Sequence, residues 1–126
     1  MDSNTHEKRQ FKRVIFSSDD GVVGIFRHHG MGDQLIASNI VNISEGGLQF
    51  IIKKDKKKEM KEGDILTLTR IKGKADLEFT DDTEIEVRWI LDLNYFDHVG
   101  VGCQFLEIQD MLKDQIKKFI EMESGS

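Results

Sequence analysis

The stretch TEIEVRWILDL, Thr83 to Leu93, alternates between apolar and polar residues. Its apolar positions are Ile85, Val87, Trp89 and Leu91, and its polar positions are Glu84, Glu86, Arg88 and Asp92. Successive side chains of a β-strand point to opposite faces of a sheet, so this spacing predicts a strand with one face in a core. The stretch therefore favours a fold built on half-buried strands.

Five further β-prone segments surround this stretch, and turn residues separate them. They are VVGIF (22–26), QLIASNIV (34–41), GLQFII (47–52), DILTLTRI (64–71) and VGVGCQFL (99–106). Because no segment of helical length lies between them, antiparallel closure is favoured. The sequence predicts a mainly β fold with six strands in an antiparallel meander or barrel.

The end of the chain changes its periodicity. Apolar residues, Met111 among them, recur at helical spacing between Ile108 and Met122, which is typical of one amphipathic α-helix. We expect its apolar stripe to cover one side of the barrel, and the alternative is a contact between two copies of the chain. A monomer or a weak dimer is therefore expected.

Composition limits the classes of function. The chain has 126 residues, enough for one domain, and its single cysteine, Cys103, excludes an internal disulfide and a cysteine-rich zinc site. The polar start and the lack of an apolar run of ~18 residues predict a cytoplasmic protein without a membrane segment. A formal net charge of −5 argues against a protein that coats a nucleic-acid polymer.

Two arginines near the start, Arg9 and Arg13, are four residues apart. This spacing places both side chains on one side of the backbone in a helix and in an extended segment. A guanidinium presents a planar fork of donors that fits phosphate oxygens or the O6/N7 edge of guanine. The pair predicts an anionic or guanine-containing ligand, although a solvated charged tail carries the same spacing.

A second polar motif, NISEGG, spans residues 42–47 and separates two apolar segments. Asn42 and Ser44 would point to one side of an extended backbone, while Gly46 and Gly47 permit positive φ and close approach of a ligand. A tight hairpin, in which a side chain bonds the backbone, is the alternative interpretation of this motif alone.

Other residues carry weaker signals. No Ser-His-Asp order, metal pair or activated cysteine is present, so we expect neither an enzyme nor a metal or cofactor. The adjacent His28 and His29 are not expected to bind a metal, and Cys103 is expected to be buried and inert. Trp89 fits the core better than base stacking, and the lysine-rich segment 53–61 is typical of a solvated turn.

Together the motifs RQFKR (9–13) and NISEGG (42–47) resemble the PilZ domain family of bacterial receptors for cyclic di-GMP. The family signature is RxxxR followed by [D/N]xSxxG, and the stretch 101–106 looks like the family's closing strand. The resemblance covers nearly the whole chain. It implies a six-stranded antiparallel barrel of the split-barrel type, followed by a C-terminal helix.

The resemblance also implies a division of roles. Residues 1–13 would form a flexible arm that carries the arginines, and residues 14–123 would form the barrel and helix. The implied ligand-binding residues are Arg9, Arg13, Asn42, Ser44, Gly46 and Gly47, with Lys8, Trp89 and Gly102 as additional candidates. Asn42 stands where the family more often has aspartate, and its neutral amide keeps a hydrogen-bond acceptor but lacks the charge of a carboxylate.

The function implied by the resemblance is that of a receptor. Binding of cyclic di-GMP would change the conformation of the domain and signal to a downstream protein that the sequence does not identify. Two alternatives remain: a ligand-independent protein-interaction module on the same barrel, and a small barrel that binds single-stranded nucleic acid.

Overall fold

The computed structural model describes residues 12–29, 34–57, 60–78, 82–92 and 97–123. Within them the chain forms seven strands and two α-helices. The strands are β1 (Arg13–Ile15), β2 (Val23–His28), β3 (Gln34–Ser44), β4 (Gly47–Lys53), β5 (Ile65–Lys72), β6 (Thr83–Asp92) and β7 (His98–Glu107). The helices are α1 (Lys54–Lys57) and α2 (Asp110–Glu123), and two 3-10 turns are η2 (Ser18–Asp20) and η4 (Ala75–Leu77).

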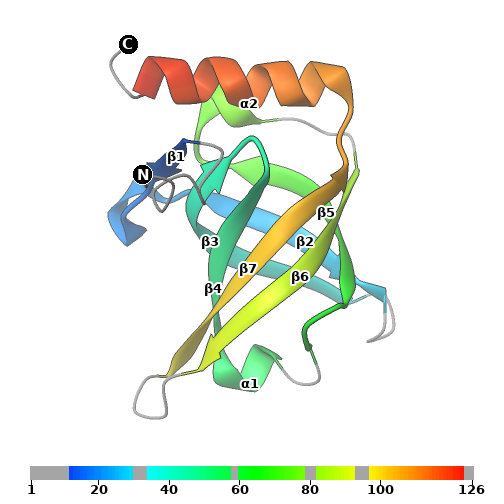
Figure 1. Ribbon diagram of the computed structural model, residues 1–126. Helices are drawn as coiled ribbons and strands as arrows, with labels where there is room; N and C mark the ends of the chain where they lie inside the picture. The colour runs from blue at the N-terminus through cyan, green and yellow to red at the C-terminus, as the bar shows by residue number, and fades with distance from the viewer. Residues whose placement is uncertain (1–11, 30–33, 58–59, 79–81, 93–96, 124–126) are drawn as a thin grey trace, which may run out of the picture.

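Strands β2 to β7 close into an antiparallel barrel (Figure 1). Their order around the ring is β3-β2-β5-β6-β7-β4, and pairing of β3 with β4 completes it. The predicted six-stranded barrel with a C-terminal helix is therefore confirmed. β1, which was not among the six predicted strands, pairs with the end of β3.

The barrel interior holds the alternate residues that the strand patterns predicted. Phe26 on β2 and Phe50 on β4 are fully buried, with ring centroids 4.5 Å apart. Burial of each such ring stabilises the fold by roughly 1.5–3 kcal/mol. The opposite residues of these strands form the outer face of the barrel, where ligands and partners have access.

Helix α2 lies across one end of the barrel (Figure 1). Its buried face consists of Leu112, Ile116, Phe119 and Ile120. The Phe119 ring packs against Phe16, which follows β1, at a centroid distance of 6.0 Å. Met111 was expected on this apolar stripe, but its side chain is 82% exposed because it lies on the outward side of the helix.

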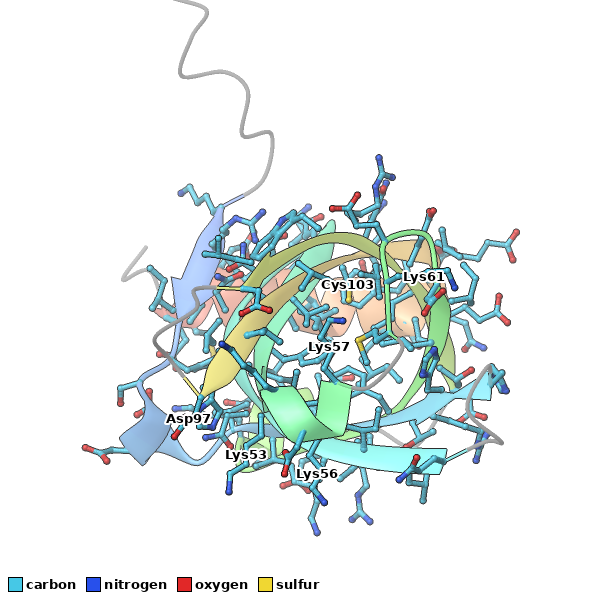
Figure 2. All side chains as sticks on the ribbon, turned by 90° about the horizontal axis from the view of Figure 1, so that it is seen from below. Lys53, Lys56, Lys57, Lys61, Asp97 and Cys103 are labelled. Carbon is cyan, nitrogen blue, oxygen red and sulfur yellow. The ribbon has the colours of Figure 1, made fainter. Side chains whose placement is uncertain are left out.

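The opposite end of the barrel carries α1 and a group of lysines (Figure 2). The segment 53–61 was expected to be a solvated turn. Within it, Lys54–Lys57 form one helical turn, and the Lys54 N–H donates to the carbonyl of Asp97.

Within the described ranges, no helix is long and apolar enough to span a bilayer.

A β-bulge in β6 changes which residues face the core. Val87 is opposite Cys103 on β7, while Trp89 is opposite Gly102, so Arg88 is an extra residue in β6. An extra residue reverses the alternation after it. Ile85 and Val87 face inward as predicted, but the interpretation of Trp89 as a core residue was wrong, because its side chain is 38% exposed on the outer face.

Candidate functional site

The two sequence motifs meet where β1 pairs with β3. Arg13 is opposite Ser44 and Ile15 is opposite Asn42 in the antiparallel register. The Arg13 Nη1 atom donates a hydrogen bond of 2.9 Å to Oδ1 of Asn42. The second arginine of RxxxR is thus fixed against the asparagine of the second motif, although 29 positions separate them in the chain.

Ser44 shapes the hairpin between β3 and β4. Its Oγ accepts a hydrogen bond of 3.2 Å from the Gly46 N–H and donates one of 3.4 Å to the Gly47 carbonyl. The Gly46 carbonyl in turn accepts from the Phe105 N–H of β7 at 3.0 Å. The serine side chain is only 2% exposed, so the structure contains the local turn that the motif alone also predicted.

Gly47 of the motif is needed for close packing rather than for a left-handed backbone. Positive φ angles occur at Gly21, Gly63 and Gly73 among the described glycines, so neither Gly46 nor Gly47 has one. A Cβ atom at position 47 would lie 2.1 Å from the carbonyl oxygen of Cys103 on β7. Any larger residue would therefore force β4 and β7 apart.

A row of outward-facing residues crosses the barrel wall beside the hydrogen bond between Arg13 and Asn42. Asn42 is opposite Gln49 on β4, Gln49 is opposite Gly102 on β7, and Gly102 is opposite Trp89 on β6. A Cβ at position 102 would lie 2.1 Å from Cε2 of Trp89, so the indole lies directly over this glycine. The structure thus brings Trp89 and Gly102 into one row with Asn42.

Two further residues of this face were missed by sequence reasoning. Gln49 is the outward polar residue of the otherwise apolar GLQFII segment, which was its only signal. Arg88 occupies the bulge of β6, and its Nη1 donates a hydrogen bond to Oε1 of Gln104. Its guanidinium also lies 3.9 Å from Glu86, on the exposed side of β6.

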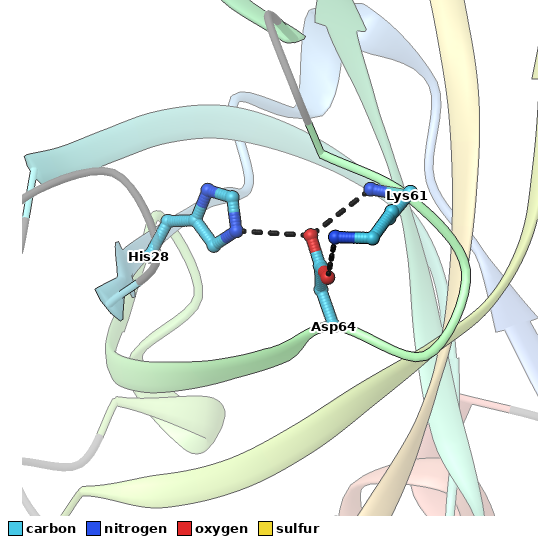
Figure 3. A network of polar contacts seen from close by, with 3 residues as sticks. All are labelled: His28, Lys61 and Asp64. Atoms are coloured by element: carbon cyan, nitrogen blue, oxygen red, sulfur yellow. Dashed lines mark hydrogen bonds and ion pairs between the residues drawn. The ribbon is translucent and has the colours of Figure 1, made fainter.

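Several residues considered in the sequence lie elsewhere or outside the described ranges. Lys8 and Arg9 belong to residues 1–11, which the structure does not describe. The buried His28 has its Nε2 atom 3.1 Å from Oδ2 of Asp64, an acid that also accepts from Lys61 (Figure 3). No cluster of metal-binding side chains occurs within the described residues.

Cys103 is buried, as the sequence predicted. Its side chain is 7% exposed and points into the barrel. Burial raises the pKa of this thiol to about 12, because the interior disfavours the thiolate.

The barrel is similar to solved structures of PilZ proteins. Bacillus subtilis Inhibitor of motility (MotI/DgrA) is 18% identical, with a TM-score of 0.69 over 92% of this chain and 51% of that one. The PilZ domain of Escherichia coli YcgR, solved with c-di-GMP, is 14% identical, with a TM-score of 0.67 over 93% of this chain and 94% of that one.

The complex of K. pneumonia MrkH with c-di-GMP is 16% identical, with a TM-score of 0.66 over 92% of this chain and 53% of that one. The chain thus spans about half the length of MotI/DgrA and of MrkH. No match to a curated protein sequence was found. The sequence matches the PilZ domain over residues 7–122, and the chain therefore belongs to the PilZ domain family of non-catalytic, cyclic di-GMP-binding modules.

Proposed function

We propose that this chain is a cyclic di-GMP receptor that signals to another protein. The observation that supports this most directly is the hydrogen bond between Arg13 and Asn42, which joins the two motifs on the outer wall. The same wall carries Trp89 over Gly102 in the row that contains Asn42. An arginine, an amide and an exposed aromatic ring suit the phosphates, edges and faces of a guanine nucleotide.

Each proposed contact has a chemical reason. The Arg13 guanidinium is a planar fork of N–H donors, and such a fork suits phosphate oxygens or guanine O6 and N7. Arg9 would supply a second fork from the arm, and Lys8 would help to decide whether one nucleotide or a stacked pair is held. Ser44, Gly46 and Gly47 would act by holding the hairpin in shape, since the serine hydroxyl already serves the turn.

The proposed signal is an ordering of the N-terminal arm. A ligand held by Arg9 and by Asn42 would draw residues 1–11 onto the outer wall, next to β1. Such a ligand changes the surface that a partner meets, and it shifts the population toward that surface by its preference for the ordered form.

The direct test is calorimetric titration of the purified chain with cyclic di-GMP and, separately, with cyclic di-AMP. Adenine presents an amino donor where guanine presents the O6 acceptor, so an arginine fork favours guanine. We expect binding of cyclic di-GMP and weaker or no binding of cyclic di-AMP. Equal affinity for both dinucleotides would contradict the guanine contacts, and no binding of either would contradict the receptor itself.

The second candidate function is a protein-interaction module that binds no nucleotide. It is favoured by the finding that Arg13 and Ser44 both make hydrogen bonds within the ligand-free fold, which gives these motif residues a structural role. The same titration separates the two functions, because only the receptor binds the dinucleotide.

A further inference from the structure

A cleft of about 470 Å³ opens in the barrel wall between the first half of β3 and the end of β4. It lies below the row that contains Asn42, toward the α1 end of the barrel. Its lining includes Leu35, Ile36 and Ser38 from β3, Ile52 and Lys53 from β4, and Lys56 from α1. Neither motif of the proposed nucleotide site contributes a residue to it.

The cleft exists because β3 is longer than its pairing with β4. That pairing begins at Asn39, which is opposite Ile51, so no described strand pairs with Gln34–Ser38 on that edge. The Ile40 N–H donates to the Val22 carbonyl, so the backbone groups of Ile40 point toward β2. Along a strand, the N–H and C=O groups of successive residues point to opposite edges, so odd-numbered residues here point away from β2. Leu35 and Ala37 therefore direct their N–H and C=O groups into the cleft.

The walls of the cleft offer a mixture of apolar and polar contacts. The Leu35 side chain is 58% exposed on the outside of the barrel, whereas Ile36 is 8% exposed. Ser38 is 6% exposed, and its hydroxyl has no hydrogen-bond partner within the described residues. Buried hydroxyls are normally paired, so this one is available to an occupant of the cleft.

The rim of the cleft is positively charged, although the chain as a whole has a net charge of −5. Lys53 and Lys56 lie at the same end of the barrel (Figure 2), and His98 is opposite Lys53 in the register of β4 and β7. Nearby Lys54 and Lys61 form ion pairs with Asp92 and Asp64. By contrast, Lys53 and Lys56 are in no ion pair with a described residue.

We propose that this cleft binds an extended acidic peptide segment of a partner protein, which adds to β3 as a strand. The open backbone edge at Leu35 and Ala37 would bond the peptide main chain, the mode by which strands add to exposed sheet edges. Alternate peptide side chains would face Ile36, Ser38 and Ile52, and the others would face Lys53. The basic rim selects acidic residues at those outward positions.

A second copy of this chain is a poorer occupant, because it would bring the same two lysines to the cleft. Pairing the β3 edges of two copies would bring Lys53 and Lys56 of one copy close to the same lysines of the other. Like charges at close range are unfavourable. The opposite charge of an acidic segment removes this penalty.

The test titrates the isotope-labelled chain, without cyclic di-GMP, with the peptide acetyl-EVETEV-amide and with its matched counterpart acetyl-KVKTKV-amide. We expect the largest amide shifts at Leu35 and Ala37, and roughly tenfold tighter binding of the acidic peptide. Shifts centred elsewhere, or equal affinity for both peptides, would overturn the proposal.

Variants of both partners test its two parts. The double substitution Lys53→Glu and Lys56→Glu should abolish the preference for the acidic peptide, while Lys113→Glu on the exposed side of α2 should leave it unchanged. Peptides methylated on one or the other alternate set of backbone nitrogens should differ, because only one set faces β3. Equal binding of the two methylated peptides would exclude strand addition. The same amide shifts on adding decanoate, an acidic apolar molecule without a peptide backbone, would also exclude it and would leave a small-molecule site.

Discussion

Gly102 fixes the position of Trp89, because a Cβ there would lie 2.1 Å from the indole. Gly102→Ala should displace the ring, lower the free energy of unfolding by about 1–3 kcal/mol and weaken binding of cyclic di-GMP. The emission of Trp89, the chain's only tryptophan, reports the displacement. Gly100→Ala is the matched control, since its Cβ would meet the same ring at an ordinary 3.6 Å. Unchanged emission in Gly102→Ala would contradict this packing.

Arg13 has an observed contact within the fold and a proposed one with the ligand, and one substitution removes both. Arg13→Ala should weaken cyclic di-GMP binding about five- to 150-fold, as expected for loss of an arginine fork on guanine. It should also lower the free energy of unfolding by about 0.5–1.5 kcal/mol, because the bond to Asn42 is lost. Calorimetry and urea unfolding measure the two effects. Lys12→Ala, an exposed neighbour, should change neither, and wild-type affinity in Arg13→Ala would remove Arg13 from the site.

Residue types revealed the two motifs, but sequence could not place every side chain. Asn42 and Ser44 were expected on one side of the strand, and their register against β1 agrees with this. The Ser44 hydroxyl, however, is already hydrogen-bonded within the turn that follows it. Trp89 was assigned to the wrong face because strict alternation cannot predict a bulge. The extra residue, Arg88, is specified by the register against β7, which is a long-range property.

Among the elements, β1 contains Arg13, the last residue of the predicted arm, and pairs with the barrel strand β3. If a nucleotide draws the arm down, amide hydrogen exchange across residues 4–11 should slow when cyclic di-GMP is added. The amides of the hairpin around Ser44 should change much less, since they already lie in paired strands. Mass-spectrometric exchange at saturating ligand measures both. No slowing across residues 4–11 would rule out the arm as the moving element.

Helix α2 buries one aromatic residue, Phe119, against the barrel. Phe119 is 1% exposed and packs against Phe16. Phe119→Ala should lower the free energy of unfolding by about 3–5 kcal/mol, because it leaves a cavity in the core. Met122→Ala, whose side chain is 56% exposed on the same helix, should change it little. Urea denaturation compares the two, and similar losses would mean that α2 is held by other contacts.

The six barrel strands and helix α2 were predictable because their apolar residues recur at strand or helical spacing. β1 was missed because Arg13–Ile15 is too short to show a period, and its strand geometry comes from the end of β3. The helical turn in α1 was missed because its lysine-rich sequence has no apolar face to mark it.

For the molecule as a whole, acid stability depends partly on Asp64. Burial alone would raise the pKa of this carboxyl, but hydrogen bonds from Lys61 and His28 hold it below the ordinary 3.8. A lowered folded pKa stabilises the fold above the unfolded value, and this contribution is lost as pH falls through the folded value. The difference in unfolding free energy between wild type and Asp64→Asn should therefore be largest near neutral pH.

Urea denaturation at a series of pH values measures that difference. It should shrink as the pH falls below the ordinary pKa of aspartate. Asp114→Asn, at an exposed position of α2, serves as the control and should show a small difference at every pH. A constant gap between wild type and Asp64→Asn down to strongly acid pH would show that the hydrogen bonds do not favour the ionised carboxyl.

The open edge of β3 also affects the tendency of this protein to aggregate at high concentration. Unpaired strand edges are templates on which identical chains can grow into ordered aggregates, and lysines beside an edge are a natural protection against this. We therefore expect Lys53 and Lys56 to oppose pairing of the Gln34–Ser38 edge with another copy of the chain. Because their repulsion is electrostatic and screened by ions, high salt should bring the chain closer to self-assembly than dilute buffer does.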